Sequence, residues 1–230
     1  MHGKCGRLNA LEDALTSTIF GFLKYPGFSG MLNDFFDSAV QYYDPSCGFS
    51  SSSESKSLKS SVPEFHFWKN LSAGEQPDLI IEWTDGVIFV EIKYGSEQSG
   101  ESQLVRYYKA MERDYAKKQY KALIYITADS VSPLLPRMTE SLRGRNFYWV
   151  PWENLHPVLA SHREKAPELI AAIVNDLMGI MTGRELVPFS GFNSVAPYLA
   201  RDIFFWRESS LMFSEYVYQK CGEDHIFWFE

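Results

Sequence analysis

The stretch that decides the fold is QPDLIIEWTDGVIFVEIKY, residues 76–94. Two largely apolar runs, residues 78–84 and 87–93, flank the dipeptide Asp85-Gly86. Apolar runs separated by Asp-Gly are a strong signal for a β-hairpin with a two-residue turn. We therefore expect two antiparallel strands at the centre of the domain.

Three charged residues, Asp78, Glu91 and Lys93, fall at the open end of this expected hairpin. A turn made by Asp-Gly alone would pair Asp78 with Lys93 and place Glu91 diagonally across, roughly 7–8 Å away between backbones. Side chains alternate between the two faces of a strand, so all three share one face. The spacing predicts that they lie close together.

These residue types suit metal-assisted hydrolysis of a phosphodiester bond. Asp78 and Glu91 are hard oxygen ligands of the kind that Mg²⁺ takes, and Lys93 could hold the phosphate and stabilise developing negative charge. The alternative is a cross-strand ion pair between Asp78 and Lys93, with Glu91 on a solvated face. The apolar neighbours Val90 and Ile92 favour a buried strand, where an idle carboxylate is costly.

The rest of the chain has patterns of both helices and strands. Apolar residues recur with helical spacing in residues 9–25, 31–43, 101–119, 153–161 and 167–181. Further strands are expected at residues 64–70, 122–127 and 147–150. This order predicts one α/β domain over residues 1–230, with a core at about 9–150 and a helical, aromatic-rich C-terminal extension at about 151–230.

Residues 44–61 include the run PSCGFSSSSESKSLKSS, which is rich in serine and poor in apolar side chains. Such a composition is typical of a mobile surface loop, and we expect one here.

Bulk composition limits the class of protein. Hydrophobic residues make up 45% of the 230 residues, enough for a sizeable core. The three cysteines form neither a disulfide framework nor a CxxC site, which favours a reducing cytoplasm. No apolar run is long enough to span a bilayer, so no membrane partner is expected. The net charge of −7 argues mildly against a general nucleic-acid coat but allows a local basic groove.

Pro77-Asp78, followed after the hairpin by Glu91-Ile92-Lys93, resembles the PD-(D/E)XK nuclease superfamily. The resemblance implies a restriction endonuclease-like core, in which a central mixed β-sheet is flanked by helices. It implies Asp78, Glu91 and Lys93 as catalytic residues. It also implies Mg²⁺ or Mn²⁺ as cofactor, bound by Asp78, Glu91 and the backbone carbonyl of Ile92.

Glu12 interrupts an apolar helical face and resembles the glutamate that members of this superfamily often carry on a helix before the core. The resemblance implies that Glu12 is a further metal ligand. In the alternative, Asn9 caps the helix and Glu12 closes a capping box three residues later.

Gln103 and Tyr107 lie one helical turn apart after the motif and resemble a Gln-xxx-Tyr pair of the superfamily. The resemblance implies that Gln103 orients the attacking water or a phosphate and that Tyr107 lines the site. The alternative is a polar helix flank beside a core.

Basic and aromatic residues elsewhere are less specific. Four cations line one face of the same expected helix, and three arginines cluster in an expected loop: Arg106, Lys109, Arg113 and Lys117, then Arg137, Arg143 and Arg145. A solvated face is one interpretation and contact with phosphates the other. The C-terminal aromatic residues could stack on bases, although burial in a core or interface is the commoner use.

The sequence thus predicts a metal-dependent nuclease that acts on nucleic acid, with DNA as the expected substrate. Cutting both strands of a duplex needs two sites, which is compatible with a homodimer. The alternative function is a catalytically idle module of the same fold that binds nucleic acid or protein.

Overall fold

The structure, a computed structural model, describes residues 3–94, 103–133 and 137–188. All of these belong to one compact unit, Met1–Pro188. The aromatic tail after residue 188 lies outside the described residues, as do the positions expected to begin the 101–119 helix.

A seven-stranded mixed sheet forms the centre of the unit, in the order β2-β1-β7-β6-β5-β4-β3. Its strands are β1 (Val40–Gln41), β2 (Asp44–Gly48), β3 (Glu64–Phe67), β4 (Leu79–Glu82), β5 (Gly86–Lys93), β6 (Tyr120–Thr127) and β7 (Phe147–Pro151). β5, β6 and β7 are parallel, and the other neighbouring pairs are antiparallel.

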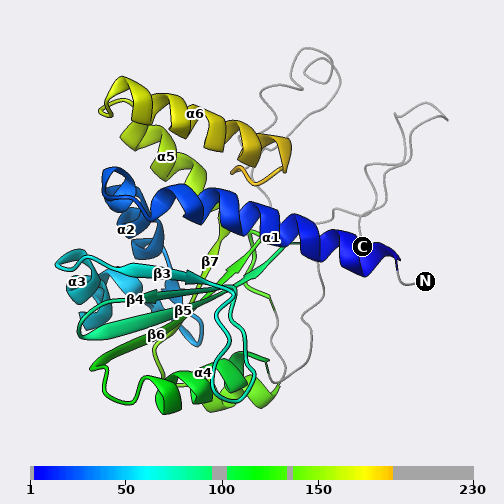
Figure 1. The fold of residues 1–230 in the computed structure, drawn as a ribbon, viewed down its shortest axis with the longest axis vertical. Helices are drawn as coiled ribbons and strands as arrows, with labels where there is room; N and C mark the ends of the chain where they lie inside the picture. The colour runs from blue at the N-terminus through cyan, green and yellow to red at the C-terminus, as the bar shows by residue number, and fades with distance from the viewer. Residues whose placement is uncertain (1–2, 95–102, 134–136, 189–230) are drawn as a thin grey trace, which may run out of the picture. The chain divides into compact units, whose positions relative to one another are not determined.

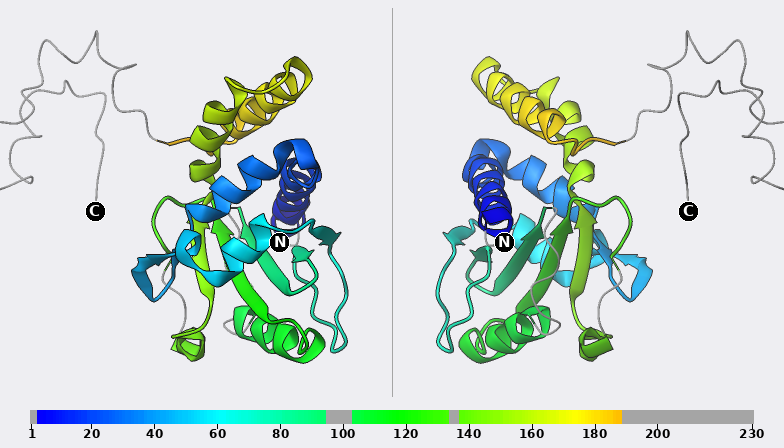
Figure 2. Two further views of the ribbon diagram at one scale, coloured as in Figure 1. Left: turned by 90° about the vertical axis from the view of Figure 1, so that its left-hand side faces the viewer. Right: turned by 90° about the vertical axis from the view of Figure 1, so that its right-hand side faces the viewer.

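Helices cover both faces of this sheet (Figures 1 and 2). α4 (Gln103–Asp114) lies on one face, between the parallel strands β5 and β6 in the chain. The opposite face is covered by α1 (Gly3–Leu23), α2 (Ser29–Asp37), α3 (Ser53–Lys59), α5 (Leu155–Arg163) and α6 (Glu168–Gly183). Short 3-10 turns occur at Pro26–Phe28, Phe49–Ser51, Arg137–Leu142 and Trp152–Asn154. The expected α/β class, a mixed sheet flanked by helices, is confirmed at this level.

β5 contributes to two hydrophobic cores because its side chains alternate between the faces of the sheet. Ile88, Val90 and Ile92 pack with the larger group of helices, whereas Val87 and Phe89 pack on the α4 side. Burial on both faces explains why this strand reads as an almost continuous apolar run. By the same alternation, Glu91 belongs to the α4 side.

The hairpin between β4 and β5 differs in register from the expected one. Glu82 pairs with Val87, and Trp83 and Gly86 exchange both backbone hydrogen bonds, so the two loop residues are Thr84 and Asp85. Gly86 therefore belongs to the strand. A Cβ atom on Gly86 would lie 2.1 Å from the indole of Trp83, so the glycine leaves room for the ring and does not serve as a turn residue.

The serine-rich segment expected as a mobile loop instead forms β2, a 3-10 turn and α3. Its few apolar side chains, Phe49 and Leu58, are buried in the core. Ser52 caps α3 by accepting a hydrogen bond from the backbone N–H of Ser55, and Ser55 donates to Asp37. Serine here provides a helix cap and a buried contact, which composition alone does not distinguish from loop residues.

The C-terminal helices extend the core. α5 contacts α2, and α6 contacts α5, so that Leu159, Val174 and Leu177 are buried. The helix expected over residues 31–43 ends at Asp37, because Val40 and Gln41 pair with β7.

Among the described residues, none of the helices has the length and apolar character needed to cross a membrane.

We expect Gly86→Ala to destabilise the protein because the new methyl group would overlap the Trp83 ring. Overpacking of this kind costs about 1–3 kcal/mol, measurable by urea denaturation. Gly179→Ala is the matched control: this α6 glycine has open space around its Cβ position, so its substitution should be neutral or stabilising. Equal stability of Gly86→Ala and wild type would contradict the proposed steric role.

Candidate active site

The candidate site lies where β4 begins and β5 ends. Continuing the β4–β5 register beyond Leu79 and Val90 places Asp78 opposite Glu91, directly across instead of diagonally. The Asp78 carboxylate accepts a hydrogen bond from the backbone N–H of Ile92, with 2.7 Å between Oδ2 and nitrogen. This bond fixes Asp78 against the neighbouring strand although Asp78 itself precedes β4.

Glu91 is almost completely buried, with 1% of the residue exposed. Among the residues that the structure describes, neither of its carboxylate oxygens has a hydrogen-bond partner of good geometry, although Oε1 lies 2.6 Å from the Lys93 ammonium. A buried carboxylate with unsatisfied lone pairs is energetically unfavourable unless a cation complements it. Glu91 therefore has capacity to coordinate something further.

Lys93 lies between two carboxylates. Its Nζ atom is 2.6 Å from Glu91 Oε1 and 3.4 Å from Glu12 Oε1, and only 11% of its side chain is exposed. The simple alternative from the sequence, an Asp78–Lys93 ion pair with Glu91 in solvent, is wrong on both points. Lys93 pairs with Glu91 and Glu12, and Glu91 is buried because β5 is a central strand.

Glu12 reaches the site from α1. One carboxylate oxygen accepts a hydrogen bond from the backbone N–H of Tyr94 at 2.9 Å, and the other faces Lys93. The capping-box interpretation is wrong, because α1 begins at Gly3 and Asn9 lies inside the helix. Glu12 thus joins the first helix to the end of β5.

Gln103 and Tyr107 are linked as expected for neighbours one turn apart on α4. Gln103 Nε2 donates to the Tyr107 hydroxyl at 2.8 Å, and that hydroxyl donates to the carbonyl of Gln76 at 2.9 Å. Gln76 lies two residues before Asp78, so Tyr107 ties α4 to the segment that positions the aspartate.

The residues that could hold a divalent cation are Asp78, Glu91 and the Ile92 carbonyl. Glu12, expected as a further ligand, instead directs its two oxygens to the Tyr94 N–H and to Lys93. N–H and C=O of one residue point to the same side of an extended strand. Because the Ile92 N–H faces Asp78, its carbonyl faces that side too. Within the described part of the chain, no group of three or more Asp, Glu, His or Cys side chains has a metal-binding arrangement. A two-carboxylate site completed by a carbonyl and waters matches the habits of Mg²⁺.

The carboxylates have perturbed acidities. Burial, and then the neighbouring Asp78, raise the pKa of Glu91 to about 8, with Lys93 opposing the shift. Burial also raises the pKa of Asp78 to about 6, despite the hydrogen bond from Ile92. Burial alone would lower the pKa of the Lys93 ammonium, but the adjacent carboxylates, Glu91 first, raise it above its usual range. The site therefore favours bound positive charge.

Two residues on β6 line the site and were missed in the sequence. Tyr125 pairs with Glu91, and Thr127 pairs with Lys93, in the parallel β5–β6 register. Burial raises the pKa of Tyr125 to about 12, and Lys93 and Glu91 act on it in opposite directions. Thr127 accepts a hydrogen bond from the Trp149 indole at 2.9 Å, which fixes its position. Only the strand register, which the sequence does not specify, could have identified them.

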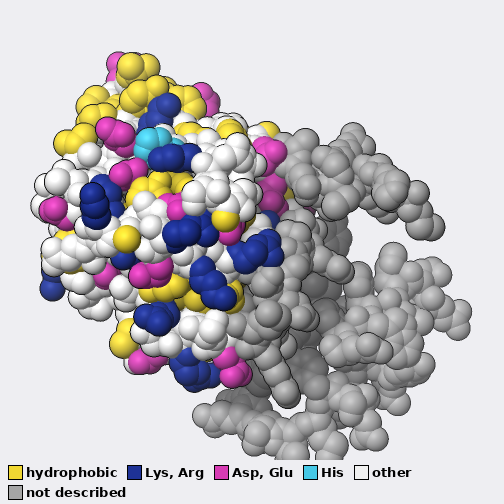
Figure 3. All heavy atoms as spheres, turned by 60° about the horizontal axis from the view of Figure 1, so that its bottom comes forward, with side chains coloured by type: hydrophobic (Ala, Val, Ile, Leu, Met, Phe, Trp, Pro, Cys, Tyr) yellow, Lys and Arg dark blue, Asp and Glu magenta, His cyan; other side chains and the backbone are white. Residues whose placement is uncertain are grey.

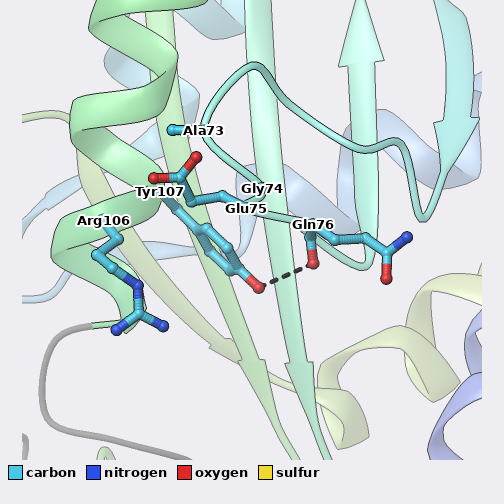
Figure 4. A pocket seen from close by; sticks show the side chains of 6 residues that line it. All are labelled: Ala73, Gly74, Glu75, Gln76, Arg106 and Tyr107. Carbon is cyan, nitrogen blue, oxygen red and sulfur yellow. Dashed lines mark hydrogen bonds between the residues drawn. The ribbon is translucent and has the colours of Figure 1, made fainter.

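A cavity of about 280 Å³ opens beside the site, between α4 and residues 73–76 (Figure 4). Its lining includes Glu75, Gln76, Arg106 and Tyr107. Tyr107 points across it toward the Gln76 carbonyl, and Arg106 lies on the neighbouring position of α4.

No family model matches the chain, and comparison with curated proteins and with solved structures gives no significant match.

We expect Glu91→Gln to flatten the pH dependence of stability. With its pKa raised from 4.5 to about 8, folded Glu91 keeps a proton that the unfolded chain releases, so wild-type stability falls across this range as pH rises. Between about pH 5 and pH 8.5, the wild type should lose on the order of 4 kcal/mol more than the variant.

Urea denaturation at several pH values measures this difference. Glu54→Gln is the control, because Glu54 is also buried but accepts a hydrogen bond from Asn146. A Glu91→Gln profile parallel to that of the wild type would contradict the assignment.

Proposed function

We propose that this chain is a metal-dependent nuclease with a restriction endonuclease-like core, which hydrolyses phosphodiester bonds in nucleic acid, DNA first among the candidates. The observation that carries the proposal is the convergence of Asp78, Glu91 and Lys93 at one end of the β4–β5 hairpin, with the buried Glu91 carboxylate paired to Lys93 through only one of its oxygens.

The arrangement of the surrounding elements supports the proposal. Glu12 on α1 contacts Lys93, and the Gln103–Tyr107 pair on α4 contacts the segment before Asp78. All the residues selected from the sequence therefore lie in one neighbourhood although they come from four separate elements or loops. A purely structural ion pair would not need this many partners from distant parts of the chain.

Asp78, Glu91 and the Ile92 carbonyl would hold the divalent cation. When bound, such an ion polarises a phosphate oxygen and lowers the pKa of a coordinated water. Asp78 is held in position by the Ile92 N–H, and Glu91 by the packing of β5. Both carboxylates must be ionised to coordinate the ion, so the site binds it better as pH rises through their raised pKa values.

Lys93 would act as a permanent cation. Its raised pKa keeps the ammonium protonated at neutral pH, so it suits contact with the scissile phosphate better than removal of a proton from water. Glu12 and Glu91 hold the ammonium at the end of the strand.

Gln103 would orient water or a phosphate oxygen. Its amide nitrogen is directed toward the Tyr107 hydroxyl, which in turn is anchored on Gln76. Tyr107 therefore serves to position Gln103 relative to Asp78. A cytoplasmic location and a homodimer belong to the same proposal, the latter because cutting a duplex requires two sites.

The direct test is cleavage of duplex DNA, single-stranded DNA and RNA with Mg²⁺, with Mn²⁺ and with EDTA. We expect metal-dependent cleavage by the wild type and a loss of about 100-fold or more in rate for Asp78→Asn, Glu91→Gln and Lys93→Ala. Asp78→Asn and Glu91→Gln should keep the wild-type fold, because each new side chain has nearly the same shape as the one it replaces.

Lys59→Ala is the matched control for Lys93→Ala, because Lys59 also forms an ion pair, with Asp37 on α2, away from the site. Its activity should equal that of the wild type. Cleavage that is independent of metal, or that survives in all three site variants, would disprove the assignment. Nucleic-acid binding without any cleavage would favour the idle-module alternative.

A second test needs no substrate. Mn²⁺ should raise the thermal midpoint of the wild type, because a ligand that binds only the folded state stabilises it, by about 2.7 kcal/mol at 100 times its Kd. The shift should be larger at about pH 8.5 than at about pH 6, since protons compete with the metal. Asp78→Asn should abolish the shift and Glu54→Gln should retain it; equal shifts in both would locate the metal elsewhere.

A further inference from the structure

The solvent-facing side of α4 is strongly basic. Arg106, Lys109 and Arg113 recur at spacings of three and four residues, which places them on one stripe of the helix. All three are exposed, and exposed Lys117 follows just beyond the helix end. Figure 3 shows Lys and Arg side chains gathered on the face of the molecule that contains α4. The stripe from Arg106 to Arg113 extends about 10 Å along the helix axis.

Only part of this charge is neutralised by nearby acids. Arg113 is paired with Asp114 and Glu75, at 2.7 Å and 3.2 Å. Lys109 and Lys117, in contrast, form no hydrogen bond or ion pair with any other residue that the structure describes. Because the whole chain has a net charge of −7, unpaired cations on one face are a local feature and do not reflect the composition.

Two arginines from the segment before β7 add to the same side of the sheet. The Arg143 guanidinium lies 4.9 Å from the ring centre of Tyr43, and that of Arg145 lies 5.8 Å from the ring centre of Tyr108, an α4 residue. These cation–π contacts restrict the position of each guanidinium while both arginines remain exposed. These are suitable contacts for phosphates.

The basic side of α4 is connected to the candidate site by the helix itself. Tyr107, which is anchored next to the Asp78 segment, directly follows Arg106. The cavity lined by Arg106, Tyr107 and Gln76 opens between them (Figure 4). A polymer that enters the site near Tyr107 can therefore continue along the exposed side of α4.

We propose that the α4 basic face, defined as Arg106, Lys109, Lys117, Arg143 and Arg145, binds the sugar-phosphate backbone of the nucleic acid that enters the site. The inference rests on the proposed function and adds the surface that holds the substrate. Contacts of this type position the polymer without reading its sequence. Each phosphate neutralised releases condensed counterions, so binding must weaken steeply with salt.

The test is binding of fluorescently labelled 20-mers of duplex DNA, single-stranded DNA and RNA in EDTA, where metal-dependent cleavage is suppressed. We expect Lys109→Gln/Lys117→Gln to reduce the salt slope by about 1.8 on a duplex or about 1.4 on a single strand. Affinity at about 100 mM salt should fall on the order of tenfold or more. Both lysines are exposed, so the thermal midpoint should stay at the wild-type value.

Lys56→Gln/Lys165→Gln is the matched control: it removes the same charge from two exposed lysines, on α3 and after α5. It should leave slope and affinity within about twofold of the wild type. Equal effects of the two double variants, or no effect of either, would overturn the inference. Vesicles containing phosphatidylserine are included as a second anionic ligand. The inference would also be overturned if Lys109→Gln/Lys117→Gln lost binding to these vesicles and kept its full affinity for nucleic acid.

Failure of this inference can be distinguished from failure of the proposed function. If the wild type cleaves, and Lys109→Gln/Lys117→Gln binds and cleaves as well as the wild type, the inference about the basic face is rejected and the proposed nuclease activity stands. Salt-dependent binding that requires these lysines, in a protein that never cleaves, would keep the basic face and reject the nuclease. Asp78→Asn should bind like the wild type in EDTA, because Asp78 lies outside the basic face.

Discussion

The rest of the candidate site depends on one charged group, the Lys93 ammonium. It lies between a carboxylate on its own strand, Glu91, and one on the first helix, Glu12. Without it, the end of β5 would bring together three acidic side chains with no compensating charge in a poorly hydrated place. The ammonium lets the chain assemble α1 against the central hairpin.

Burial and hydrogen bonding act differently on the two carboxylates. Asp78 is partly stabilised as an anion by the Ile92 N–H, whereas Glu91 depends on Lys93 and remains incompletely satisfied. The raised pKa values of both carboxyl groups follow from this environment. A group of unfavourable charges kept at the end of the buried central strand β5 is more readily explained by function than by stability.

Sequence patterns predicted the main helices and strands because burial requires apolar side chains, at regular spacing in the helices and in an almost continuous run in β5. They also selected Asp78, Glu91 and Lys93, because the observed register differs from the expected one by two residues, and an even shift keeps the three side chains on one face. The hairpin register itself was wrong, since Asp-Gly is a turn signal whereas Gly86 is needed for packing against Trp83. Tyr125 was missed because parallel pairing depends on distant residues. The serine-rich segment was misread since serine caps helices as readily as it fills loops.

The two outer strands of the described sheet have a consequence for self-association. β2 is short, contains Pro45 and exposes most of its side chains, and β3 is followed by Trp68 in a left-handed backbone conformation. Proline lacks an N–H for further pairing, and an abrupt change of backbone direction limits how far a strand can be extended. Edge-to-edge growth of the sheet is thereby discouraged, which protects the chain from aggregating through strand addition.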